Sequence, residues 1–260
     1  MSEAAAPAGA ARVRSAMARR VMFASLMGAM KVIVFGATGM IGQAALRECL
    51  LDPGVEAVLA VGRRATGQSH PKLREIVHRD FLDFSAIERD LAGYDACLYA
   101  LGVSSAGMSE PDYTRVTYDF AVAAAQAVLR NNPAATFVFV SGASTDGTEK
   151  GRLMWARVKG RTENAILAMP FKDSYMFRPG YIQPLHGIAS STRATRMMYA
   201  VMAPLYPLWK ALFPSHVTTT ETLGRAMIRV ARDGWATHVL EVRDINAAGG
   251  GAPSAQAARP

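Results

Sequence analysis

The sequence predicts an α/β fold, a doubly wound parallel sheet with helices on both faces and a small C-terminal cap. Three observations lead to this fold. Short apolar segments alternate with helix-like segments, a glycine-rich turn follows the first of them, and 260 residues suit one such domain. Half of the residues are hydrophobic and 19% are charged, which excludes a disordered or fibrous chain.

The first βαβ unit is the clearest part of this pattern. Residues 31–35, with the sequence KVIVF, form the β-branched and aromatic run that is typical of a parallel strand buried on both faces. A helix is predicted over 43–51 and a second strand over 55–61, with the turn sequence DPG between them. The same alternation predicts strands at 76–78, 96–100, 136–141 and 174–178, and helices at 85–92, 113–130, 154–168 and 220–232.

The two ends of the chain are predicted to lie outside this domain. Residues 1–30 hold four arginines and one glutamate, and we expect a disordered extension, with a translation start placed too far upstream as one explanation. A targeting peptide is the alternative interpretation. The domain is expected over 31–246, and a flexible tail over 247–260.

A cap over the sheet is expected at about 183–216. Its large side chains include Met197, Met198, Tyr199, Met202, Tyr206 and Trp209. The simplest interpretation is that they cover the exposed end of the sheet, with an apolar substrate cavity second and peripheral membrane contact third. Pro204, Pro207 and Lys210 interrupt the longest apolar run, so no membrane span is predicted.

The net charge of +8 does not by itself indicate a nucleic-acid-binding protein. The chain has no dense basic run with interleaved aromatic residues, so no nucleic-acid partner is expected. Cys49 and Cys97 lie far apart and form no CxxC motif, which predicts neither a disulfide framework nor a zinc site. A cytoplasmic location is the resulting expectation.

The glycine-rich turn predicts a site for a dinucleotide. Gly36, Gly39 and Gly42 directly follow the first strand and open the first helix. In such a turn the first glycine allows a tight bend, the second lets the backbone approach a pyrophosphate, and the third allows close helix packing. The helix N-terminus then offers unpaired N–H groups to the anion. The other turn residues expected to line this site are Thr38, Met40 and Ile41.

The residues after the second strand predict a preference for NADP(H) over NAD(H). A site that prefers NAD places a carboxylate there, which binds the ribose 2′-hydroxyl. This chain has Arg63 and Arg64 instead, whose guanidinium groups can pair with a 2′-phosphate. Two solvated surface arginines are the alternative interpretation.

Two later strand ends are expected to add cofactor contacts. Asp80 and Phe81 follow the third strand and are predicted to lie at the adenine edge. Ala100, Leu101 and Gly102 follow the fourth strand and are predicted to lie beside the ribose and the diphosphate. Packing alone would explain the second group equally well.

Together these residues resemble the short-chain dehydrogenase/reductase superfamily, in its atypical or extended branch. The motifs are FGATGMIG at 35–42, GRR at 62–64, DF at 80–81, FVFVSGAS at 137–144, WARVKGRTE at 155–163 and FRPG at 177–180. Within that branch the chain is similar to the Tat-interacting-oxidoreductase-like and NAD-dependent epimerase-like proteins over about 31–242. The resemblance implies an NAD(P)-binding Rossmann fold.

The resemblance also implies a catalytic pair, Tyr-x-x-x-Lys, on one helical face. Lys159 matches the lysine, which in the family binds the nicotinamide ribose and lowers the pKa of the tyrosine. The tyrosine position holds Trp155, whose indole cannot act as an acid or base near neutral pH. Ser141 and Ser144 match the region of the family's catalytic serine, which polarises a carbonyl.

Further site residues follow from the same resemblance. Pro179 and Gly180 are expected to lie against the nicotinamide, and a homodimer through two of the predicted helices is a family expectation. Tyr181 and His186 are candidates for a displaced acid, although a pocket wall and a surface histidine are the plainer interpretations.

Two functions of different classes remain open at this point. The first is an NADP(H)-dependent oxidoreductase or epimerase-like enzyme that acts on a small, fairly apolar carbonyl or alcohol. The second is a catalytically silent NADPH-binding sensor or assembly module. Lys159 and Ser141 favour the enzyme, whereas Trp155 favours the module.

Overall fold

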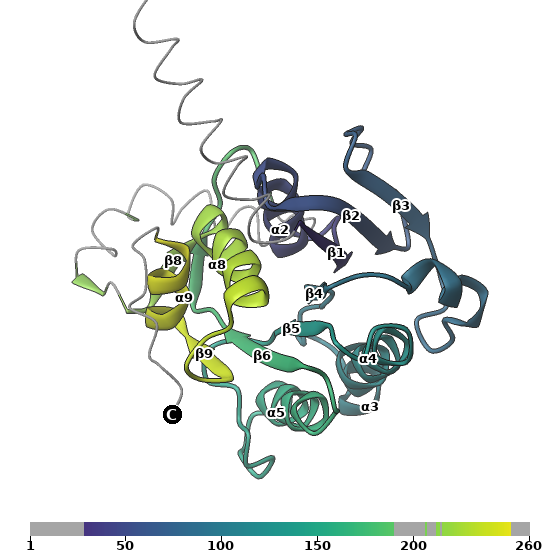
Figure 1. The fold of residues 1–260 in the computed structure, drawn as a ribbon. Coiled ribbons are helices and arrows are strands. Elements are labelled where there is room, and N and C mark those ends of the chain that lie inside the picture. Colours follow the sequence, from purple (N-terminus) through teal and green to yellow (C-terminus); the bar gives the residue numbers. More distant parts are fainter. Residues whose placement is uncertain (1–28, 190–205, 207–211, 214, 251–260) are drawn as a thin grey trace, which may run out of the picture.

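Seven parallel strands form the central sheet of the computed structural model, which describes residues 29–189, 206, 212–213 and 215–250. The strand order is β3-β2-β1-β4-β5-β6-β9 (Figure 1), which confirms the predicted doubly wound α/β fold. The order changes direction between β1 and β4, and in such sheets ligands bind at that point, beyond the carboxyl ends of the strands. The strands are β1 (Met30–Phe35), β2 (Val55–Gly62), β3 (Leu73–Val77), β4 (Ala96–Tyr99), β5 (Thr136–Val140), β6 (Asp173–Arg178) and β9 (Val239–Glu241).

Helices cover both faces of the sheet (Figure 1). Strand β1 shows how the sequence produces two cores, because alternate side chains point to opposite faces. Val32 and Val34 lie in one buried cluster, and Ile33 and Phe35 lie in the other. The first face carries α2 (Met40–Leu51), α8 (Thr220–Asp233) and α9 (Val242–Gly249), and the second carries η1 (Ser85–Leu91), α4 (Phe120–Asn131) and α5 (Met154–Leu167).

The helix predicted over 113–130 begins earlier and contains a wider turn. Ser109 caps its start, since its hydroxyl accepts a hydrogen bond from the N–H of Asp112 at 3.3 Å. The helical segment predicted at 85–92 is the 3-10 helix η1. The longer segment consists of α3 (Glu110–Thr114), a π-helical turn, η2 (Arg115–Asp119), and α4.

The C-terminal region holds elements that the sequence pattern does not predict. Strands β7 (Tyr181–Gln183) and β8 (Val217–Thr219) pair in a second, two-stranded parallel sheet. Helix α9 runs past the expected tail boundary at 247, and Ala248 and Gly249 are buried. A Cβ on Gly249 would lie 2.0 Å from the carbonyl oxygen of Thr222, so α9 packs closely on α8.

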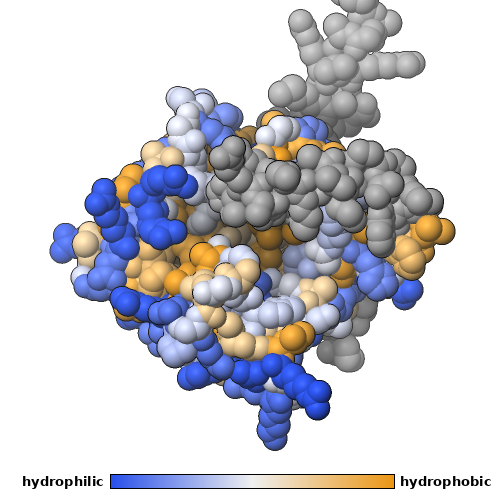
Figure 2. Space-filling view, turned by 180° about the vertical axis from the view of Figure 1, so that it is seen from behind, coloured by the Kyte–Doolittle hydropathy of each residue, from blue (hydrophilic) through white to orange (hydrophobic). Residues whose placement is uncertain are grey.

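Most of the expected cap and both chain ends lie outside the described residues. This applies to 1–28 and 251–260, and to the cap residues Met197, Met198, Tyr199, Met202 and Trp209. Within the described part of the chain, no helix combines the length and the apolar character that a bilayer span needs. Figure 2 shows apolar surface gathered near the middle of one face, with hydrophilic side chains toward its edges.

Candidate functional site

Two glycines of the turn after β1 are required by the backbone conformation and the close packing of the fold. Gly36 has a φ of 81°, and a Cβ on it would lie 2.7 Å from the backbone nitrogen of Leu101. A Cβ on Gly42 would lie 2.0 Å from the carbonyl oxygen of Gly36. The tight bend and the close packing of α2 therefore exclude any side chain at these two positions.

Two other glycines have room for a Cβ atom instead. Among the described residues, a Cβ on Gly39 would meet nothing nearer than the carbonyl oxygen of Gly36, at an ordinary 3.4 Å, and a Cβ on Gly102 would meet no atom of a residue outside its chain neighbours within 4 Å. Neither backbone is left-handed. Gly39 begins α2 without a side-chain cap, so the first N–H groups of the helix have no side-chain partner. This space fits a pyrophosphate approached closely by backbone.

The structure brings the other predicted turn residues to the same place. The side-chain amide of Gln43 donates to the carbonyl oxygen of Thr38 at 3.0 Å, which fixes the turn before Met40 and Ile41. The N–H of Ala100 donates to the carbonyl oxygen of Phe35 at 3.0 Å. The loop after β4 is therefore held against the glycine turn, across the crevice between β1 and β4.

Arg63 and Arg64 lie at the same edge of the sheet. They directly follow β2, which pairs with β1, and both are exposed. Among the described residues, neither guanidinium group has a hydrogen bond or an ion pair. Both side chains are therefore available to an anionic ligand beside the glycine turn.

The side chain of Phe81 lies in the core of the protein. Its side chain is 1% exposed and packs among Phe35, Phe84 and Phe120, with ring centroids 5.7–6.3 Å away. The ring fills the core, so the predicted contact of Phe81 with the adenine edge would have to come from its backbone. Asp80 is exposed as expected, and its carboxylate accepts a hydrogen bond from the N–H of Leu82 at 3.0 Å.

Lys159 lies against the carboxyl end of β5. Its ammonium group donates a hydrogen bond to the carbonyl oxygen of Ser141, and a Cβ on Gly142 would lie 3.7 Å from its Nζ. Burial lowers the pKa of Lys159 to about 8, against a weaker opposing effect of the Glu163 carboxylate. Trp155 is partly buried one turn earlier on α5, and its indole has no hydrogen bond within the described part of the chain.

The two candidate serines have different surroundings. Ser141 is 6% exposed, and its hydroxyl donates to Oε1 of Glu163 at 2.5 Å. Ser144 is exposed, and its φ of 66° is unusual for a residue other than glycine. Ser144 therefore offers a free surface position, whereas the hydroxyl of Ser141 is already bound to a neighbour.

The loop after β6 places Pro179 and Gly180 beside the end of β5. The N–H of Ala143 donates to the carbonyl oxygen of Pro179 at 2.9 Å, and a Cβ on Gly180 would lie 2.5 Å from the carbonyl oxygen of His216. Gly180 also lines a cavity that sequence reasoning missed. The cavity has a volume of about 330 Å³ and is lined by Ala143, Ser144, Gly180, Ser215, His216, Glu241, Val242 and Arg243.

Neither candidate for a displaced acid lines that cavity. The hydroxyl of Tyr181 donates to Oε1 of Gln183 at 2.9 Å. The Nε2 atom of His186 lies 2.6 Å from Oε2 of Glu221, at the start of α8. Both side chains have hydrogen-bond partners elsewhere in this structure, and His186 is exposed, as in the plainer interpretation.

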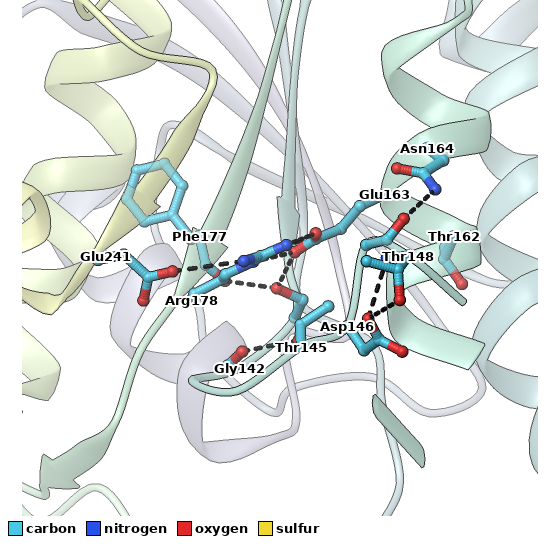
Figure 3. Close-up of polar contacts among 12 residues, drawn as sticks. Gly142, Thr145, Asp146, Thr148, Thr162, Glu163, Asn164, Phe177, Arg178 and Glu241 are labelled. Carbon is cyan, nitrogen blue, oxygen red and sulfur yellow. Dashed lines mark hydrogen bonds and ion pairs between the residues drawn. The ribbon is translucent and has the colours of Figure 1, made fainter. Parts of the chain in front are cut away.

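A buried polar cluster lies beneath Lys159, and sequence reasoning did not identify it. Glu163 is 1% exposed and accepts hydrogen bonds from Nε of Arg178 at 3.0 Å and from its Nη2 at 2.5 Å. Figure 3 shows Arg178 extended between Glu163 on α5 and Glu241 at the start of α9, 3.4 Å from its Nη1. The cluster joins three elements at the carboxyl edge of the sheet.

The strand order and the glycine turn define a protein of the Rossmann class. Residues 32–159 match the model of the NAD dependent epimerase/dehydratase family, so over this segment the chain is similar to that family. The match confirms the resemblance to the short-chain dehydrogenase/reductase superfamily.

Solved structures agree on the fold. WbmF of Bordetella bronchiseptica, in complex with NAD+, is 16% identical with a TM-score of 0.60, and the match covers 85% of this chain and 77% of that one. A UDP-N-acetylglucosamine 4-epimerase from Methanobrevibacter ruminantium, in complex with UDP-N-acetylmuramic acid, is 14% identical with a TM-score of 0.60, covering 82% and 76%.

Curated relatives overturn the expected location. "Protein FMP52, mitochondrial" of Meyerozyma guilliermondii is 27% identical over 194 residues, 69% of this chain and 80% of that protein. The protein of the same name from Eremothecium gossypii is 31% identical over 156 residues, 59% and 66% of the two chains. Since these relatives are named as mitochondrial, the prediction of a cytoplasmic protein is wrong.

Proposed function

We propose that this chain is an NADP(H)-binding oxidoreductase of the short-chain dehydrogenase/reductase kind. The observation that carries the proposal is the room for a Cβ atom that the described residues leave at Gly39 and Gly102, near the uncapped start of α2. The protein's own packing does not explain either glycine, whereas a pyrophosphate lying there explains both. The NAD+ in the WbmF structure and the name of the matching family support the same class of ligand.

The preference for NADP(H) rests on the two arginines after β2. A 2′-phosphate adds negative charge to the adenosine ribose, and Arg63 and Arg64 offer two guanidinium groups that no described neighbour neutralises. No carboxylate stands at 62–64 to bind a free 2′-hydroxyl. The charge at this end of the site therefore favours the phosphorylated cofactor.

A bound nicotinamide would supply hydride transfer, and this chain's residues would arrange the rest. Lys159 binds the ribose hydroxyls through its ammonium group. We assign the hydroxyl that polarises a substrate carbonyl to Ser144, because Ser144 lines the cavity, whereas the hydroxyl of Ser141 is buried on Glu163. Trp155 cannot donate the proton, so it comes from water or from Lys159, whose pKa of about 8 lies near neutrality.

The cavity beside Ser144 is the proposed substrate position. Its wall combines the apolar Ala143 and Val242 with the polar His216 and Arg243. A small, fairly apolar carbonyl compound or alcohol with one polar end fits this lining. A homodimer remains an expectation of the family resemblance.

Trp155 supports a second candidate function. A chain that has lost the usual acid but kept its cofactor site would serve as an NADPH-binding sensor or assembly module. In that case the cofactor binds and no carbonyl compound is turned over. The two functions share the binding site and differ in the chemistry beside Lys159.

Fluorescence titration of the purified protein with NADPH and with NADH tests the proposal. We expect micromolar affinity for NADPH, seen as quenching of tryptophan emission and energy transfer to the nicotinamide, with much weaker binding of NADH. Gly102→Ala tests the position of the ligand, and it should weaken NADPH binding, since its methyl group fills the space without meeting another described part of the chain. Binding of neither nucleotide would reject both functions.

A further inference from the structure

We propose that Glu163 and Arg178 are positioning residues that hold Ser141 and the ammonium group of Lys159 in place. The inference rests on the proposed role of Lys159 in binding the nicotinamide ribose. Neither residue is proposed to touch the cofactor. They act through Ser141, which contacts both Lys159 and Glu163.

The geometry at Ser141 is the first part of the argument. Its carbonyl oxygen accepts a hydrogen bond from Lys159, and its hydroxyl donates to Glu163 at 2.5 Å. Its N–H donates to the carbonyl oxygen of Phe177 at 2.8 Å, and its hydroxyl lies 3.2 Å from the same oxygen. Contacts with α5 and β6 therefore hold Ser141 in place. Because Lys159 donates to the carbonyl oxygen of Ser141, these contacts also position Lys159.

The charges are the second part. Glu163 lies one helical turn after Lys159 on α5 and is almost completely buried, so its carboxylate needs a partner. Arg178 supplies that partner through two nitrogens. The Glu163 carboxylate in turn raises the pKa of Lys159 against the effect of burial. Lys159 therefore keeps more positive charge than its burial alone allows.

The connection to the cavity is the third part. Arg178 lies between Glu163 and Glu241 (Figure 3). Glu241 ends β9, caps α9 and lines the cavity beside Ser144. An ion pair that merely joined β6 to α5 would need neither the Ser141 hydroxyl nor Glu241. The cluster instead connects the proposed substrate cavity with the residue that binds Lys159.

The test measures the pKa of Lys159 by NMR in the full chain with ¹³C-labelled lysine. Lys159 is one of six lysines, and Lys159→Arg assigns its signal. We expect the pKa to fall by about one unit in Glu163→Gln and in Glu163→Gln/Arg178→Gln, because both lack the nearby anion. We expect no fall in Arg178→Gln. A purely structural role would change the burial of Lys159, and so its pKa, in the same direction in all three.

An unchanged pKa in Glu163→Gln overturns the inference. That variant leaves Arg178 buried without its anion, and such a change can prevent folding. The double variant buries no unpaired charge, so an unchanged pKa there is equally decisive.

NADPH titration of the same proteins separates this inference from the proposed function. It is made at a pH between the native and the variant pKa values. If the pKa falls as expected but the affinity for NADPH is unchanged, the positioning of Lys159 stands and its proposed role in cofactor binding fails.

Discussion

Gly42 lies so close to Gly36 that a Cβ atom on Gly42 would be 2.0 Å from the carbonyl oxygen of Gly36. The contact is with backbone, so no side chain can move aside to relieve it. For Gly102, in the loop after β4, no described residue other than its chain neighbours has an atom within 4 Å of a Cβ built in the same way. The packing of the fold therefore requires glycine at position 42, whereas glycine at position 102 would be required only by a ligand.

Replacement of Gly42 by alanine is expected to destabilise the fold by about 3 kcal/mol, because the new methyl group overlaps backbone. Gly102→Ala is expected to change the free energy of unfolding by less than about 0.5 kcal/mol and to weaken NADPH binding about tenfold. Urea unfolding and nucleotide titration of both variants check this. Gly102→Ala with native affinity would contradict the assignment of the open space to the cofactor.

Arg63→Glu is expected to reverse the cofactor preference. It replaces a partner of the 2′-phosphate with a repelling charge, so the affinity for NADPH should fall about 100-fold, while the affinity for NADH holds or rises. Arg89→Glu is the matched control, because it makes the same change in net charge in the last turn of η1, just before β4 begins. Equal losses in the two variants would mean that the effect is only that of overall charge.

Lys159→Met is expected to stabilise the fold at neutral pH. The native lysine has a pKa of about 8 in the fold, well below its ordinary value of 10.5, so burial of its charge costs stability below pH 8. After the lost hydrogen bond to Ser141 is allowed for, the gain should be about 2 kcal/mol.

This gain has a defined pH dependence. As the pH rises from about 8 toward 10.5, the folded lysine becomes neutral while the unfolded one is still charged, so the native protein recovers stability. The difference between Lys159→Met and the native protein should therefore shrink over that range. Urea unfolding at several pH values measures this difference in the free energy of unfolding. A difference that stays constant with pH would show that the charge on Lys159 does not destabilise the native protein.

Trp155→Tyr distinguishes the two candidate functions. If the site is otherwise competent, a phenol one turn before Lys159 restores an acid, and oxidation of NADPH in the presence of small ketones and aldehydes should increase at least tenfold. Trp155→Phe controls for loss of the indole, since it adds no hydroxyl. Equal rates in both variants would favour the sensor or assembly module.

The buried strands could be predicted because the sequence of each one is enough to identify it as a strand. In β1, β4 and β5 nearly every side chain is apolar, as both faces of the sheet are covered. Strands β7, β8 and β9 have three residues each and exist through pairing with distant segments, which no local pattern reveals. The start of α3 did have a local signal, Ser109 followed by Pro111 and Asp112.

Some residues of the candidate site could likewise be predicted from the sequence, and others could not. The glycine turn is contiguous, so its spacing predicted both its shape and its neighbours. The burial of the Phe81 ring could not be predicted, because an aromatic residue after a strand is compatible with an exposed and with a core position. Glu163 and Arg178 are 15 residues apart on different elements, and only the fold brings them together. One clue existed, since a charged residue that ends the otherwise buried strand β6 needs a partner.

The glycines of the turn also bear on how relatives of this chain should be compared. A descendant that ceased to use a nucleotide would still be selected to keep Gly36 and Gly42, because a side chain at either position would overlap backbone and destabilise the fold. Selection would relax at Gly39 and Gly102, where a methyl group overlaps no atom of the described residues. The presence of glycine at positions 39 and 102, rather than at 36 and 42, therefore indicates whether a relative has retained its ligand.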